Sequence, residues 1–177
     1  MNDKYLEKQV YKVTIAAPIE TVWSELIKTA SPRPFFWNSR WDTRAMSAGE
    51  RYRMVSKNGK GVAVIGEIIE MEPPRLLVTS FRLTGLDDPA SKVTYTLAET
   101  EAGTEFCLIT ENVLAGSKSE GAMSGGAQFI VKNFKAYIET GNVTFGARMT
   151  LLMFAAMESM TPKAMRAENW PLNKAKQ

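Results

Sequence analysis

Histidine is absent from all 177 residues of the chain. This absence excludes Ser-His-Asp and Cys-His nucleophile systems, zinc sites with histidine ligands, and the commonest general base near neutral pH. Only carboxylates, lysine, tyrosine and arginine remain for chemistry, and no spacing among them singles out a catalytic pair. We therefore assign no catalytic residue and expect neither a metal nor another cofactor.

Cysteine, secretion signals and long apolar runs are also scarce. The single Cys107 cannot form an internal disulfide, which fits a reducing compartment. The N-terminus reads MNDKYLEKQVYK and lacks the apolar core of a secretion signal. The longest apolar run, Leu151 to Met157, is far shorter than the ~20 residues that span a bilayer. We therefore predict a cytoplasmic protein.

Excess charge of one sign is missing too. The chain has 22 basic and 19 acidic residues, a net charge of +3, and the two signs are interspersed. Without a basic stripe, binding to nucleic acid is not expected. Apolar residues, at 45%, are plentiful, and the length suits one domain with a packed core.

Alternating apolar and polar residues with a β-rich vocabulary predict about six strands. The Asn58-Gly59 dipeptide marks a hairpin turn, and Pro73-Pro74 interrupts the strand pattern. Because the connections have hairpin length, the strands should pair antiparallel. The predicted strands cover residues 9–16, 51–55, 62–72, 76–83, 93–98 and 105–113.

Helical spacing of apolar residues predicts two helices around these strands. A short one follows Pro18 over residues 19–27 and ends at the Ser-Pro-Arg-Pro sequence of residues 31–34. A long amphipathic one begins near Ala127 and ends near Gly141. Its apolar stripe must be buried, and the sheet is the only large surface available.

Two segments have no clean period. Residues 35–42, FFWNSRWD, predict a loop or a single helical turn. Residues 116–127, GSKSEGAMSGGA, lie between a strand and a helix as a phosphate-binding loop would. However, Ala122 and Met123 stand where that motif needs Lys and Ser or Thr. We predict a flexible entrance loop here.

The order strand, short helix, strand meander and long helix is the helix-grip plan, and several short motifs agree with it. Together they span about residues 9–142 and resemble the SRPBCC (START-like, Bet v 1-like) superfamily, specifically domains of the Activator of Hsp90 ATPase homologue type. The motifs are APIETVW at residues 17–23, GERYR at 49–53, GEIIEMEPPRL at 66–76, GGAQ at 125–128 and NFKAYIETG at 133–141.

The resemblance implies an α+β helix-grip fold, in which a curved antiparallel sheet clasps the long C-terminal helix. It assigns residues 1–142 to this domain and leaves residues 143–177 as a Met-rich helical extension. The chain shows no separate N-terminal chaperone-binding domain of the kind found in the two-domain chaperone activator. Direct stimulation of Hsp90 is therefore not expected.

The resemblance also implies a cavity between sheet and helix that in many members holds an apolar small molecule. Our first hypothesis is non-catalytic binding of an apolar or amphipathic small molecule there, although the same side chains fit an ordinary core. The expected lining residues are Tyr52, Met54, Phe81, Tyr95, Phe106, Ile130 and Phe134, with Phe36, Trp37 and Trp41 near the mouth.

Two charged residues on apolar strands complete the candidate site. Glu67 shares a strand face with Ile65, and Arg82 shares one with Val78, so either side chain could project into the cavity and orient a ligand. Burying either charge alone would be costly, which favours pairing or exposure. An alternative is a polyketide cyclase-like enzyme in which Glu67 or Tyr95 transfers a proton.

Beyond Gly141 the resemblance ends, but a Met-rich apolar pattern continues. Five of the ten methionines lie between Met149 and Met165, in a predicted helix that is apolar nearly all round. Our first expectation is that this helix packs against its own domain and completes its core. A second is a partner surface, either a homodimer or a chaperone-linked interaction, because methionines adapt to irregular grooves. Membrane attachment is not favoured, because the apolar part carries only Arg148.

Overall fold

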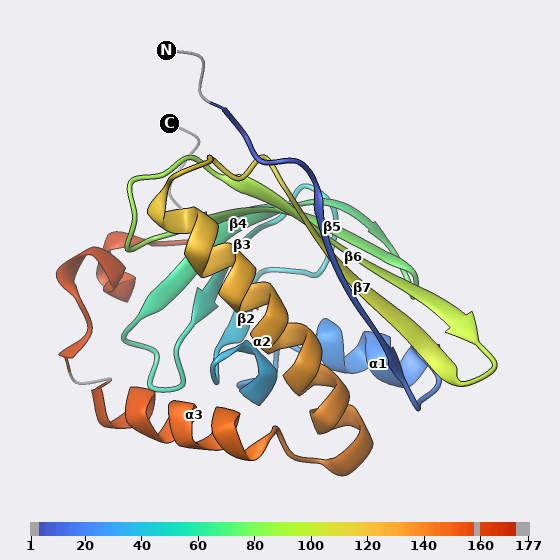
Figure 1. Cartoon of the computed structure of the whole chain (residues 1–177). Helices are drawn as coiled ribbons and strands as arrows, with labels where there is room; N and C mark the ends of the chain where they lie inside the picture. The colour runs from blue at the N-terminus through green and yellow to red at the C-terminus, as the bar shows by residue number, and fades with distance from the viewer. Residues whose placement is uncertain (1–3, 158–159, 173–177) are drawn as a thin grey trace.

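A curved seven-stranded sheet with a long helix across one face forms the body of the molecule (Figure 1). The structure, a computed structural model, describes residues 4–157 and 160–172. All neighbouring strands are antiparallel, in the order β1-β7-β6-β5-β4-β3-β2. The strands are β1 (Gln9–Ile15), β2 (Arg40–Thr43), β3 (Arg51–Val55), β4 (Val62–Glu72), β5 (Leu76–Leu83), β6 (Ser91–Thr100) and β7 (Gly103–Glu111). The predicted helix-grip fold is confirmed.

The prediction of about six strands missed β2. This strand begins within residues 35–42, for which we predicted a loop or a single helical turn. The chain first makes the 3-10 helix η1 (Pro34–Phe36) and then turns through Trp37 and Asn38, whose φ angles are +51° and +55°. Such left-handed angles are uncommon outside glycine. β2 has four residues, lies at the sheet edge and pairs only with β3, so it is too short to show an alternating pattern.

The first helix, α1 (Ile19–Leu26), follows its prediction and buries Ile19, Val22, Trp23 and Leu26. The long helix α2 (Lys118–Thr140) begins earlier than predicted, so the expected flexible loop over residues 116–127 is wrong. Its glycines lower intrinsic helix propensity and obscured the pattern. One of them, Gly126, packs closely against Trp37, since a Cβ there would lie 3.2 Å from the tip of the indole ring.

The α2 N-terminus is fixed by a reciprocal capping arrangement. The Ser117 Oγ accepts a hydrogen bond from the Glu120 amide at 3.2 Å, and Glu120 Oε2 accepts one from the Gly116 amide at 2.7 Å. The Glu120 amide also donates to the Ser117 carbonyl at 3.3 Å, so the first turn of the helix is fixed by both the backbone and the side chain of Ser117. The sequence Ser117-Lys-Ser-Glu120 carries this signal, which the glycine-rich interpretation overlooked.

We predict that Ser117→Ala lowers the free energy of unfolding by about 1 kcal/mol, because it removes the cap. Ser117→Asp should remain near the wild-type value, since aspartate also caps and its charge favours the positive end of the helix dipole. Urea denaturation followed by circular dichroism measures both. Equal midpoints for the two variants would contradict a capping role.

The core lies between α2 and the concave face of the sheet. The Phe134 ring of α2 is 4.4 Å from Phe35 and 4.9 Å from Phe106, between ring centroids. At the far end of α2, Glu139 Oε1 accepts hydrogen bonds from the Ala16 amide at 2.7 Å and from Lys135 at 2.6 Å. The helix is therefore held to the sheet by buried rings and by the hydrogen bond between Glu139 and the residue that follows β1.

The third helix, α3 (Phe145–Met157), is only partly covered by the domain. The buried Asn133 of α2 accepts hydrogen bonds from the Thr144 amide and hydroxyl, and Ala147 and Leu151 are buried. From residue 152 to 157 every side chain is exposed. The expectation that this helix would complete its own core is thus met only in its first half. Glu158 and Ser159, within the predicted apolar helix, lie outside the described residues.

Among the described residues, no helix is long and apolar enough to cross a membrane. After α3 the chain continues through two short 3-10 helices, η3 (Lys163–Met165) and η4 (Ala167–Asn169). Arg166 forms a β-bridge with Gly61, and Arg53 donates hydrogen bonds to the carbonyls of Ala167 and Trp170. This C-terminal segment is therefore attached to strands β3 and β4.

Candidate functional site

Most of the predicted pocket residues do come together, but as a packed aromatic interior. Phe36 lies 6.4 Å from Trp41 and 6.3 Å from Tyr95, and Tyr95 lies 6.3 Å from Phe106, between ring centroids. The members that belong to the buried core are Phe36, Trp41, Tyr52, Met54, Tyr95, Phe106, Ile130 and Phe134. Phe81 and Trp37 pack against this core and are partly buried. Ring-to-ring contacts occupy the region between α2 and the sheet.

Trp37 lies where the η1 turn meets α2. Its indole stacks on the Phe129 ring at 4.7 Å with an interplanar angle of 13°. Trp37 has a left-handed backbone conformation, and its ring lies close to the Gly126 backbone. Both the backbone turn and the packing therefore position its side chain. The sequence-based assignment of Trp37 to a mouth of the interior is consistent with this partly buried position; a ligand contact there stays a prediction.

Glu67 and Arg82 do not project into the helix–sheet interior, contrary to the prediction. Arg53, Ile65 and Arg82 are register partners across β3, β4 and β5, while their neighbours Met54 and Val64 belong to the core. Since alternate strand residues face opposite ways, this row faces away from α2. Glu67, two residues from Ile65 and paired with Arg51, follows the same face. Ligand binding by either residue stays a prediction.

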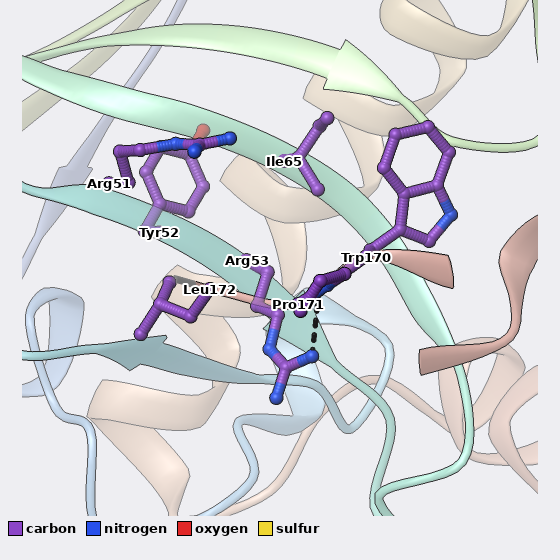
Figure 2. Close-up of a pocket in the computed structure, with 7 residues that line it drawn as sticks. All are labelled: Arg51, Tyr52, Arg53, Ile65, Trp170, Pro171 and Leu172. Carbon is purple, nitrogen blue, oxygen red and sulfur yellow. Dashed lines mark hydrogen bonds between the residues drawn. The ribbon is translucent and has the colours of Figure 1, made fainter. Parts of the chain in front are cut away.

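A small pocket lies on that outer face, where the C-terminal segment crosses the sheet (Figure 2). Its lining residues are Arg51, Tyr52, Arg53, Ile65, Trp170, Pro171 and Leu172. Arg53 is neutralised by Asp42 and also donates to the Trp170 carbonyl at 2.8 Å. The Arg82 guanidinium lies 6.0 Å from the Trp170 ring. These contacts attach the C-terminal segment to the sheet. The Arg53 charge is already paired with a carboxylate of the same chain.

The least expected feature is Arg33, which sequence analysis treated only as part of a helix-terminating segment. Its side chain is 1% exposed. Its Cζ lies 4.3 Å from the Phe36 ring centroid and 4.9 Å from that of Trp41. Nη1 donates to the Leu26 carbonyl at 2.6 Å, and Nη2 approaches Met54 Sδ at 3.5 Å. The sole signal in the sequence was a cation two residues before the aromatic segment that begins at Phe35.

Arg33 carries its charge inside the apolar core. Burial lowers the pKa of Arg33 to about 9, so the guanidinium remains charged at neutral pH. Within the part of the chain that the structure describes, it has no ion pair with a carboxylate, and its Nε is buried without a hydrogen-bond partner. The contacts that offset this desolvation are the two rings and the Leu26 carbonyl at the end of α1, where a positive charge is favoured.

The residues named for proton transfer do not lie together in this structure. Burial raises the pKa values of Tyr52 and Tyr95, so both phenols stay protonated at neutral pH. Tyr95 faces the interior whereas Glu67 faces outward, so the two residues offered as alternatives for proton transfer lie on opposite sides of the sheet. No group of three or more Cys, Asp or Glu residues that could hold a metal occurs in the described ranges.

Known structures share this architecture at low sequence identity. The solution structure of the Aha1 dimer from Colwellia psychrerythraea has a TM-score of 0.61 at 13% identity, covering 77% of this chain and 98% of that one. An Hsp90 activator from Plasmodium falciparum, PFC0360w, has a TM-score of 0.59 at 16% identity over 74% and 95%. CalU16 from Micromonospora echinospora has a TM-score of 0.52 at 23% identity over 85% and 84%.

Sequence comparison gives a narrower assignment. No match was found among curated proteins. The family model described as "Activator of Hsp90 ATPase homolog 1-like protein" matches residues 16–139, which lie within the predicted helix-grip domain. The division at residue 142 stays a prediction, but the resemblance seen in the sequence motifs is confirmed. The match spans well over half of the chain, and the protein therefore belongs to the Activator of Hsp90 ATPase homolog 1-like family.

Proposed function

We propose that the protein is a non-catalytic protein-binding module and that its binding surface is the exposed side of α3. The observation that carries this proposal is the stripe Phe145, Met149, Met153 and Met157, spaced four residues apart along one side of the helix. These side chains are 48–76% exposed. Leu152 and Phe154 widen the surface, which we call the α3 apolar face. Contiguous apolar surface of this kind marks an interaction site.

The anchoring of α3 supports a surface that is held in place. Its N-terminal end is fixed by the Asn133–Thr144 hydrogen bonds and by buried Ala147 and Leu151. The second half contributes no buried side chain to the domain, so intramolecular packing gives no reason for its apolar composition. A helix that is apolar on nearly all sides is stable in water only when another surface covers it.

The partner that best fits this face is a second copy of the chain. Arg148 is the one charged residue of α3, so two α3 helices can meet across a twofold axis without opposing charges along the stripe. Methionine side chains adapt their shape to a facing surface. A relative of the same fold is described as a dimer, which is consistent with this choice. A membrane partner is less suited, because such helices carry many Lys and Arg residues on their polar side.

The proposal predicts that sedimentation equilibrium yields twice the 19.7 kDa mass of one chain. Met153→Glu should weaken association by at least about 100-fold, because a desolvated and unpaired carboxylate would enter the interface. Circular dichroism of the variant should match that of the wild type, since Met153 is 66% exposed in one chain.

The matched control is Ile69→Glu in β4. Ile69 is 50% exposed and lies in the sheet, outside α3. The substitution introduces the same charge as Met153→Glu. It should leave the dissociation constant unchanged. A wild-type protein that sediments as a monomer, or an Ile69→Glu variant that dissociates as readily as Met153→Glu, would contradict self-association through α3.

Binding of an amphipathic small molecule remains a second candidate function, supported by one specific observation. A charged side chain with an unpartnered buried nitrogen, Arg33 Nε, lies among the aromatic residues that the sequence assigned to a ligand pocket. Proteins of this fold commonly bind ligands, which agrees with such a role. The cavity itself, the cytoplasmic location and the cyclase-like alternative stay predictions.

A further inference from the structure

The hydrogen-bonding geometry of Arg33 distinguishes the two edges of its guanidinium. One nitrogen, Nη1, is bound to the Leu26 carbonyl at 2.6 Å. The opposite edge consists of Nε and Nη2, whose N–H bonds point in parallel. Nε has no hydrogen-bond partner among the described residues, and Nη2 meets only the Met54 thioether at 3.5 Å. A thioether sulfur is a weak acceptor, so this edge lacks an oxygen.

The Nε–Nη2 edge is the one that binds a carboxylate side-on, through two parallel charge-assisted hydrogen bonds. A carboxylate there would supply the missing acceptor and also the missing counter-charge. No Asp or Glu within the described part of the chain provides it: the carboxylate of Glu25, which acts on Arg33 electrostatically, is bound to Lys28 at 3.1 Å. The fold therefore places a carboxylate-binding edge inside an apolar core and leaves it without a carboxylate.

Access to this edge depends on Met54. Its side chain is 2% exposed and ends at the guanidinium edge. Methionine has three rotatable bonds and repacks at low cost, so its thioether can give way more readily than a ring. The surrounding Phe36, Trp41 and Tyr95 side chains would contact the apolar part of a molecule whose acidic group reaches Arg33.

We propose that the interior binds an amphipathic monocarboxylate, with its carboxylate on the Nε–Nη2 edge of Arg33 and its apolar portion between the Phe36, Trp41 and Tyr95 rings, for which the Met54 side chain and these rings must move apart. This inference rests on the second candidate function, which it narrows to one class of ligand, and it is independent of α3 association. The acidic group sets the orientation, and the apolar portion replaces contacts that the core already makes.

Isothermal titration with octanoate, octanol and octylammonium tests the proposal on the wild-type chain. The three probes have the same apolar chain and differ in the charge of the head group. Octanoate should bind at one site at least about tenfold more tightly than octanol, because only octanoate pairs with the guanidinium, and octylammonium should not bind. In ¹H–¹⁵N spectra, octanoate should move the Arg33 Nε–H resonance downfield, whereas octanol should leave it in place.

Arg33→Lys keeps a positive charge but removes the two-donor edge, so octanoate affinity should fall at least about tenfold. Arg75→Lys, at an exposed arginine paired with Glu99 on the sheet, is the matched control and should bind octanoate as the wild type does. The wild-type titrations decide the question even if Arg33→Lys fails to fold.

Equal affinity for octanoate and octanol would overturn carboxylate recognition while leaving small-molecule binding intact. No binding of any of the three probes would overturn both. Unchanged octanoate affinity in folded Arg33→Lys, or an unmoved Nε–H resonance at saturating octanoate, would likewise overturn the assignment to Arg33.

Discussion

Phe134→Ala is expected to lower the free energy of unfolding by about 3–5 kcal/mol, the range for truncating a buried phenylalanine. Phe134 is fully buried and is the α2 side chain whose ring meets both Phe35 and Phe106. Its removal leaves a cavity between the long helix and the sheet, and the aromatic rings on either side cannot collapse into it without losing their other contacts. Guanidinium denaturation at equilibrium gives the change directly.

Tyr5→Ala provides the comparison, since it deletes an aromatic ring that is 45% exposed near the chain start. Its cost should stay within about 0.5 kcal/mol, as is usual for surface substitutions. If Phe134→Ala were as mild as Tyr5→Ala, the interior would be loosely packed around α2. The space between the helix and the sheet would then not be filled.

Gly66→Ala is expected to cost about 3 kcal/mol or more, at the upper end of overpacking effects. A Cβ at residue 66 would overlap the Ser80 carbonyl of β5 and approach the Tyr52 ring to 2.7 Å. The Ser80 carbonyl also accepts the Tyr52 hydroxyl at 2.8 Å, so backbone and ring are fixed together. The added methyl group can be accommodated only if β4 and β5 move apart.

Gly125→Ala makes the same chemical change with the opposite expected sign. Residue 125 lies in α2, and no atom lies within 4 Å of a Cβ built there. Alanine should stabilise the helix by about 0.5–1 kcal/mol, because it has the better helix propensity and restricts the unfolded chain. Thermal and urea denaturation of both variants compare the two sites. Shifts of equal sign would show that close approach at Gly66 is not the controlling factor.

Local pattern was sufficient where one residue period dominated. The alternation over Val62–Glu72 gave β4 with its observed bounds, and Gly141 ends α2 with a φ of +75°. The pattern failed where a tertiary contact decides the structure. Gly126 looked like a loop residue, but it is a helical position that lies close to the Trp37 ring. β2 exists because β3 pairs with it, which four residues alone cannot reveal.

The candidate site shows the same division. Tyr52, Tyr95 and Phe106 were found because the strand period places them on one face, and Phe134 because of the helical spacing of its neighbours. Arg33 was missed because its role arises from contacts with Leu26 and Met54, which lie 7 and 21 residues away along the chain. The outward direction of Arg82 was missed for a related reason. A strand period gives two faces, and only the packing of α2 shows which of them becomes the core.

The two attachments on either side of α3 have a consequence for how it can meet another molecule. Thr144 is hydrogen-bonded to Asn133 of α2 just before the helix begins, while Arg166, further on, forms a β-bridge with Gly61, the residue before β4. A helix whose start is anchored to the domain has fewer orientations to lose on docking than a free segment. Preorganisation of this kind lowers the entropic cost of association and lets a modest contact area yield stable binding.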